Sequence, residues 1–135
     1  MNYYLKNTIA GILGTTIMSI LIFLSENINL PRLPVWEIIS EKTNTPIIIG
    51  WLIHFLIGIF FAFIFSLFSR KEFYKINIST GMIFGFTIFI FVQTLSITTS
   101  GIKENQLLLA LGSAIGHIIY GAVIGFFLQT KDKSL

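Results

Sequence analysis

Cysteine is absent from this chain of 135 residues, and charged residues are scarce. The absence of cysteine excludes disulfides, iron–sulfur clusters and thiol catalysis, although it does not indicate a compartment. Asp, Glu, Lys and Arg together make up 11% of the residues, which is less than half of the roughly 25% that a soluble domain carries. This composition therefore does not fit an ordinary soluble globular domain.

The charged residues are also missing from four long stretches, which comprise residues 7–25, 43–69, 76–102 and 105–130. These stretches are 19, 27, 27 and 26 residues long, and roughly 20 apolar residues are enough for a helix to cross the hydrocarbon core of a bilayer. We therefore expect an all-α fold in which the whole chain, 1–135, is one integral membrane domain. The expected transmembrane helices cover residues 7–24, 47–68, 78–98 and 106–129.

The longest connection, residues 25–45, is the least apolar part of the chain and contains two prolines, the second being Pro34. A single continuous helix cannot pass through such a site. After Pro34, Glu37 and Glu41 fall on one side of a helical pattern and apolar residues fall on another. This predicts a short interfacial helix in the first extracytoplasmic loop, with Trp36 at headgroup depth.

The basic residues flank the apolar stretches and form no patch, so we expect no nucleic-acid partner although the pI is near 9.3. With four spans, one side holds Lys6, Arg70, Lys71, Lys75, Lys131 and Lys133, and the other holds Arg32, Lys42 and Lys103. Six against three favours both termini in the cytoplasm. The expected location is the inner (plasma) membrane, with the lipid bilayer as the immediate partner.

In the second and fourth predicted spans, every fourth residue forms a series made mostly of small residues with one histidine, and the two series are 63 positions apart. The first series is Gly50, His54, Gly58, Ala62 and Ser66, and the second is Ser113, His117, Gly121, Gly125 and Gln129. We interpret this as a duplicated helical hairpin, with repeats at 7–68 and 77–129. Units of two spans re-enter from the same side, so the repeats are parallel, and both histidines lie at similar depth.

Small residues in a membrane helix allow a second helix to approach closely. The predicted helix-packing positions are Gly11, Thr15, Gly50, Gly58, Ala62, Gly81, Gly85, Gly121 and Gly125. The small faces of the first and third spans, Gly11–Thr15–Ser19 and Gly81–Gly85, further suggest self-association. We therefore expect a homodimer or a membrane-protein partner as an additional interaction.

Three short motifs resemble a family of small four-helix bacterial membrane proteins of unknown function. They are Gly-Trp-Leu-Ile-His-Phe-Leu-Ile-Gly in the second span, Ile-Gly-His-Ile-Ile-Tyr-Gly in the fourth, and Leu-Pro-Arg-Leu-Pro in the first loop. The resemblance covers nearly the whole chain. It implies a four-helix fold in a membrane and no established activity.

The groups of near-neutral pKa within the predicted spans are His54 and His117, and an ionisable residue inside a membrane is a candidate functional site. The favoured interpretation is structural: a neutral imidazole hydrogen-bonds to another helix, with Gln93, Thr94 or Tyr120 as partner. The alternative is a bis-histidine site for haem or another metal, since imidazole suits iron, copper and zinc. We expect no resident cofactor.

The favoured function is a non-enzymatic accessory or scaffold protein, because the sequence contains no phosphate loop, His-Glu-x-x-His or Gly-x-Ser-x-Gly motif. No catalytic residue is predicted. The first rival is an electron-transfer subunit with haem or metal on the two histidines. The second is a small transporter or channel subunit, although the spans lack the acidic residue that cation transport would be expected to use.

Overall fold

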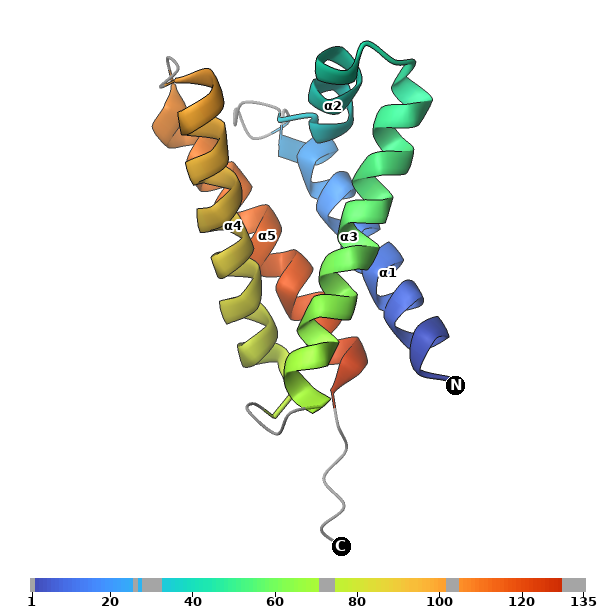
Figure 1. The fold of residues 1–135 in the computed structure, drawn as a ribbon. Helices are drawn as coiled ribbons and strands as arrows, with labels where there is room; N and C mark the ends of the chain where they lie inside the picture. Colours follow the sequence, from blue (N-terminus) through green and yellow to red (C-terminus); the bar gives the residue numbers. More distant parts are fainter. Residues whose placement is uncertain (1, 26, 28–32, 71–74, 102–104, 130–135) are drawn as a thin grey trace, which may run out of the picture.

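The structure, a computed structural model, describes residues 2–25, 27, 33–70, 75–101 and 105–129. Within these residues the chain forms five α-helices and no strand (Figure 1). The helices are α1 (Tyr3–Ser25), α2 (Val35–Thr43), α3 (Ile47–Arg70), α4 (Ile78–Ser100) and α5 (Gln106–Leu128). Part of the Leu-Pro-Arg-Leu-Pro motif, and Arg32, Lys71, Lys103, Lys131 and Lys133, lie outside the described residues.

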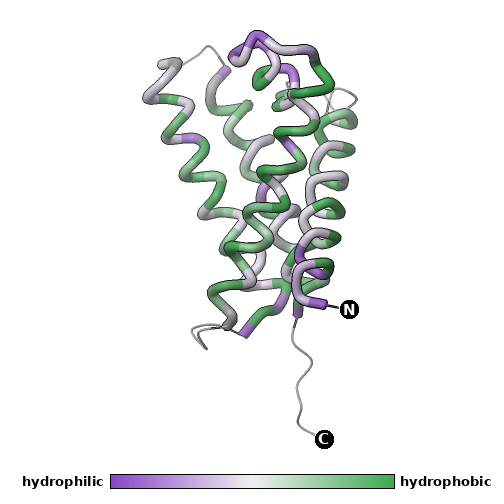
Figure 2. Tube along the Cα trace, turned by 45° about the vertical axis from the view of Figure 1, so that its right-hand side comes forward, coloured by the Kyte–Doolittle hydropathy of each residue, from purple (hydrophilic) through white to green (hydrophobic). Residues whose placement is uncertain are grey.

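In the part of the chain that is described, four helices are long and apolar enough to cross a membrane: α1, α3, α4 and α5. Each lies within a few residues of a predicted span, so the all-α prediction of four membrane-length helices is confirmed. Hydrophilic residues gather near the ends of these helices and along α2, while their middle sections are mainly hydrophobic (Figure 2).

Local hydrogen bonds set the start of α4. The Asn77 side chain accepts a hydrogen bond from the Thr80 backbone N–H at 2.9 Å, and the Thr80 hydroxyl oxygen accepts one from the Asn77 N–H at 3.0 Å. This reciprocal capping box satisfies two backbone donors that a helix start otherwise leaves without partners. It explains why α4 begins at Ile78, as the sequence predicted.

The two central helices of the bundle are α1 and α5. Helix α5 packs against α4 on one side and α1 on the other, and α1 also packs against α3. The outer helices α3 and α4 diverge toward the end where α2 lies (Figure 1). At the opposite end they meet through phenylalanine rings. The ring centroid of Phe84 in α4 lies 5.0 Å from that of Phe65 and 6.4 Å from that of Phe61, both in α3.

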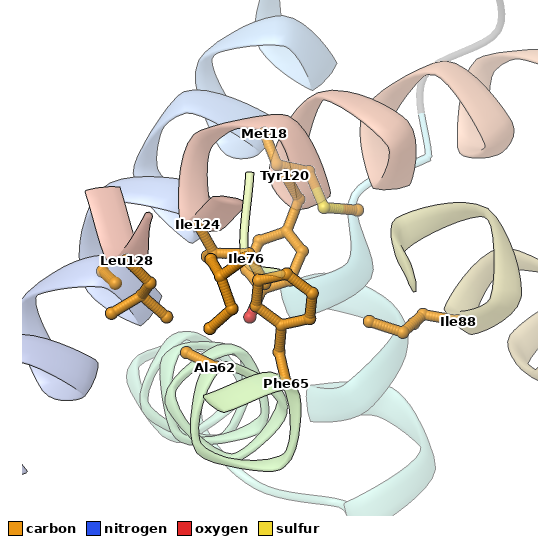
Figure 3. Close-up of a cluster of buried hydrophobic side chains, with 9 residues drawn as sticks. Met18, Ala62, Phe65, Ile76, Ile88, Tyr120, Ile124 and Leu128 are labelled. Carbon is orange, nitrogen blue, oxygen red and sulfur yellow. The ribbon is translucent and has the colours of Figure 1, made fainter. Parts of the chain in front are cut away.

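The buried core lies where these four helices converge (Figure 3). Its members are Ala10, Met18, Ala62, Phe65, Ile76, Ile88, Tyr120, Ile124 and Leu128. The start of α1 and the end of α5 lie at the same end of the bundle, because the Lys6 ammonium donates a hydrogen bond to the Leu128 carbonyl. Within the apolar window of each of these four helices, only 17% to 33% of the residues are buried within the chain.

Candidate functional site

His54 is a buried residue of α3 that contacts α1. Its Nε2 lies 3.3 Å from the Ser19 hydroxyl, which lies 2.8 Å from the Thr15 carbonyl oxygen. A carbonyl oxygen only accepts hydrogen bonds, so the hydroxyl donates to Thr15 and accepts from the Nε2–H of His54. This assigns the tautomer of His54 and connects α3 to α1 through one polar contact inside the apolar core.

A stack of aromatic rings covers His54 on the side of α2. The Trp36 and Trp51 rings are parallel to within 11° with centroids 4.0 Å apart, and the Trp36 centroid lies 5.9 Å from that of His54. Trp36 is only 1% exposed, so it points into the bundle. Helix α2 approaches this closely because Gly50 has no side chain, and a Cβ there would overlap the Trp36 carbonyl oxygen.

His117 makes a different contact from that of His54. Its Nδ1 lies 2.8 Å from the carbonyl oxygen of Ser113, one turn earlier in α5. Because this oxygen only accepts, Nδ1 carries the proton and Nε2 presents a lone pair. The ring is partly exposed and lies 6.5 Å from the Phe89 ring of α4. His117 is therefore oriented by its own helix, and its second nitrogen carries a lone pair.

Tyr120 joins the two halves of the bundle. Its ring extends from α5 across Gly14 of α1, where a Cβ would lie 2.7 Å from the ring atom Cδ2. Its hydroxyl donates a hydrogen bond to the Gly58 carbonyl oxygen of α3, with an oxygen–oxygen distance of 2.5 Å. One buried side chain of α5 thus contacts both α1 and α3.

The small residues allow close approach of backbones in both helix pairs. A Cβ on Gly58 would overlap the Thr15 hydroxyl oxygen, and a Cβ on Gly11 would lie 2.5 Å from the Ile59 Cα. In the other pair, Cβ atoms on Gly81 and Gly121 would each overlap the carbonyl oxygen of the other residue. The Cα–H groups of Gly58, Gly81 and Gly121 therefore point at oxygen atoms, the weak hydrogen-bond geometry that recurs at helix–helix interfaces.

Several predicted contacts are absent from the described residues. Neither Gln93, Thr94 nor Tyr120 hydrogen-bonds to an imidazole in this part of the chain. Thr94 instead donates to the Ile90 carbonyl oxygen, and Tyr120 donates to Gly58. These hydrogen bonds differ from the expected ones because periodicity assigns a residue to a helix face without identifying the helix that faces it.

The small faces expected to support self-association are occupied within a single chain. Thr15 and Ser19 are 1% and 4% exposed, against α3, and Gly81 and Gly85 contact the backbone of α5. Those residues are therefore covered within the chain, and the expected homodimer or membrane-protein partner stays a prediction. Sequence reasoning also passed over Ser19 as a histidine partner and over Asn7, which is 1% exposed with an Oδ1 that has no hydrogen-bond partner among the described residues.

The described residues contain no group of three or more His, Asp or Glu side chains arranged to hold a metal ion. The two imidazoles differ in the contact that Nε2 makes. His54 Nε2 is engaged by Ser19, whereas His117 Nε2 is a lone pair on a ring whose other nitrogen bonds to a backbone carbonyl.

The fold and these contacts define a small α-helical protein with four membrane-length helices, joined by close glycine contacts and a few buried hydrogen bonds. A family model described as a family of unknown function (DUF6789) matches residues 1–134. The chain belongs to this family. Neither a curated protein nor a solved structure matches the chain.

Proposed function

We propose that the chain is a four-span accessory or scaffold protein of a bacterial inner membrane, that it is not an enzyme, and that both termini lie in the cytoplasm. The length and apolarity of α1, α3, α4 and α5 support the four spans. The excess of Lys and Arg in the segments on the side of the termini, six against three, supports the orientation. Helix α2, whose exposed Glu41 contrasts with its buried Trp36, is then an interfacial helix.

The observation that supports a structural role is that buried polar side chains form hydrogen bonds between helices. The Ser19–His54 and Tyr120–Gly58 hydrogen bonds each connect different helices. Such interhelical bonds in membrane proteins are worth about 0.6 kcal/mol on average and up to about 1.7 kcal/mol. Helix association alone explains why these polar side chains are buried, and no bound substrate is needed. This favours an accessory or scaffold protein over an enzyme.

The matching of contacts in the two helix pairs supports a duplicated hairpin. Gly58 of α3 lies against both Gly11 and Thr15 of α1, and Gly121 of α5 lies against both Gly81 and Gly85 of α4. Gly58 and Gly121 are 63 positions apart, and Gly11 and Gly81 are 70 apart, as are Thr15 and Gly85. We infer two parallel repeats, 7–68 and 77–129, with the same contact at the centre of each.

The proposal is tested by purifying the protein in mild detergent and recording visible absorption, metal content and the folded state together. A colourless, metal-free and folded protein that shows no ion or solute flux in proteoliposomes is the expected result. His54→Ala should then lower thermal stability without removing any ligand. Stoichiometric haem or metal, or flux above that of empty vesicles, would overturn the accessory role.

One observation favours a second candidate, a haem or metal ligand at His117. Histidines that bind metals almost always donate their other ring N–H to a carboxylate, a backbone carbonyl or water, and the His117 Nδ1–H donates to the Ser113 carbonyl oxygen. His54 is less suited, because Ser19 engages its Nε2. If this candidate is correct, added haem gives an absorption band that His117→Ala removes and His54→Ala retains.

A further inference from the structure

Helix α4 carries a regular pattern on the surface that faces away from the bundle. Counting from Ile83, alternating steps of four and three residues reach threonine and isoleucine in turn. The residues are Ile83, Thr87, Ile90, Thr94 and Ile97, which we call the α4 seam. This is the 3.5-residue spacing of a helix that packs along its length against another helix.

In the part of the chain that the structure describes, the residues of the α4 seam are exposed. Ile83, Ile90 and Ile97 are 67%, 49% and 38% exposed, and Thr87 and Thr94 are exposed as well. Helix α4 contacts α5 through its opposite face, which includes Gly81 and Gly85. At 3.6 residues per turn, the two faces point about 180° apart. Of the four spans, α4 also has the smallest buried share, 17%.

The threonines of the seam are already satisfied as hydrogen-bonding groups. Thr87 donates to the Ile83 carbonyl oxygen at 3.0 Å, and Thr94 donates to the Ile90 carbonyl oxygen at 2.8 Å. They can therefore be covered by another helix without leaving a polar group unpaired. Their side chains are also shorter than the exposed rings of Phe86 and Phe91 on either side, so a facing helix can approach closely at the threonine positions.

We propose that the α4 seam packs against the α4 seam of a second copy of this chain, forming a parallel two-fold dimer in the membrane. Two copies inserted in the same orientation place their α4 helices parallel, and a two-fold axis then brings each seam residue opposite itself. Threonine meets threonine and isoleucine meets isoleucine in successive layers. Helix α4 contains no charged residue from Ile78 to Ser100, so like charges do not oppose this self-pairing.

The extent of the seam is sufficient for a membrane dimer. From Ile83 to Ile97 it covers about 21 Å along the helix at 1.5 Å per residue, or about two thirds of the roughly 30 Å hydrocarbon core. Helix association in lipid depends on such continuous van der Waals packing, because lipid supplies no hydrophobic driving force between helices. The inference rests on the proposed membrane insertion of α4, and on no other part of the proposed function.

The absence of natural cysteine makes disulfide mapping a direct test. Single-cysteine variants Thr87→Cys and Thr94→Cys are compared with Met82→Cys and Leu95→Cys in proteoliposomes under mild oxidation. The two control positions are exposed on α4, at 42% and 53%, but point about 110° from the seam. We expect dimers of twice the chain mass at the seam positions, at least tenfold above the controls. Equal crosslinking at all four positions, or no crosslinking at the seam positions, would overturn the proposal.

A second measurement uses energy transfer between differently labelled copies at increasing lipid dilution. Ile83→Ala combined with Ile90→Ala should raise the apparent dissociation constant at least tenfold, whereas Met82→Ala combined with Leu95→Ala should leave it within twofold. Equal effects of the two pairs would contradict packing through the seam. Flotation with vesicles is measured first: a chain that floats and does not dimerise disproves only the dimer, while a chain that does not float disproves the membrane assignment.

Discussion

The hydroxyl of Tyr120 in α5 donates a hydrogen bond to the backbone carbonyl oxygen of Gly58 in α3, across helix α1. Both residues are buried, and the Tyr120 ring occupies the space that Gly14 leaves open. This contact joins the α4–α5 pair to the α1–α3 pair. It makes the association of the two pairs depend on one phenol group and on two glycines that cannot carry side chains.

We predict that Tyr120→Phe lowers the free energy of unfolding by about 1 kcal/mol, because it removes this hydrogen bond and retains the ring. The measurement is a denaturation midpoint in detergent or bicelles. Tyr4→Phe is the matched control, since Tyr4 is 71% exposed, and it should shift the midpoint by much less. Equal shifts in the two variants would argue against a special role for Tyr120.

Two glycines of the same helix should respond in opposite ways to alanine. A Cβ at Gly121 would overlap the Gly81 carbonyl oxygen, whereas a Cβ at Gly112 would have no atom within 4 Å. Gly121→Ala forces α4 and α5 apart, and overpacking of this kind costs roughly 1–3 kcal/mol. Gly112→Ala should be neutral or slightly stabilising, because alanine favours helix over glycine.

The measurement for this pair is thermal stability of each variant in the same detergent, with helix content followed by circular dichroism. A stable Gly121→Ala protein would show that the close approach of α4 and α5 is not needed for the fold. A destabilised Gly112→Ala protein would show that the face around Gly112 is covered by something other than lipid.

Charge-free length predicted the four long helices well, because the thickness of a bilayer fixes how long an uncharged helix must be. Helices α3 and α4 also begin at the residues where the second and third predicted spans begin, Ile47 and Ile78. Small-residue spacing likewise identified Gly58 and Gly121 as packing positions. These features depend on one segment at a time, so a single sequence contains enough information for them.

Contacts between helices were harder to predict. The partner of His54 is Ser19, a residue of α1 that sequence spacing assigned to a surface for self-association. Several small-residue faces are chemically alike, and the sequence does not say which two meet. The sequence also contains the alternating Thr and Ile residues of the α4 seam. Their exposure could be established only after the structure located α5 on the opposite face of α4.

Trp36→Ala should detach α2 from the bundle. Trp36 is 1% exposed and stacks on Trp51 at 4.0 Å, and removing a buried large aromatic side chain typically costs about 3–5 kcal/mol. Backbone amides of α2 should then exchange faster with solvent while those of α5 are unchanged. Ile48→Ala, at a residue 68% exposed on α3, is the control. Protection of α2 that survives Trp36→Ala would contradict its attachment through this stack.

The contact between Ser19 and His54 can be isolated from other effects by a double-mutant cycle. Ser19→Ala, His54→Ala and the double variant are unfolded under identical conditions, and the coupling energy is the part of the double change that the single changes do not explain. We expect about 0.6 kcal/mol, and no more than about 1.7 kcal/mol, as found for interhelical hydrogen bonds in lipid. A parallel cycle with Ser19→Ala and His117→Ala should show no coupling, because His117 bonds within its own helix. Coupling of similar size in both cycles would mean that Ser19 interacts with both imidazoles, and it would contradict a contact that is specific to His54.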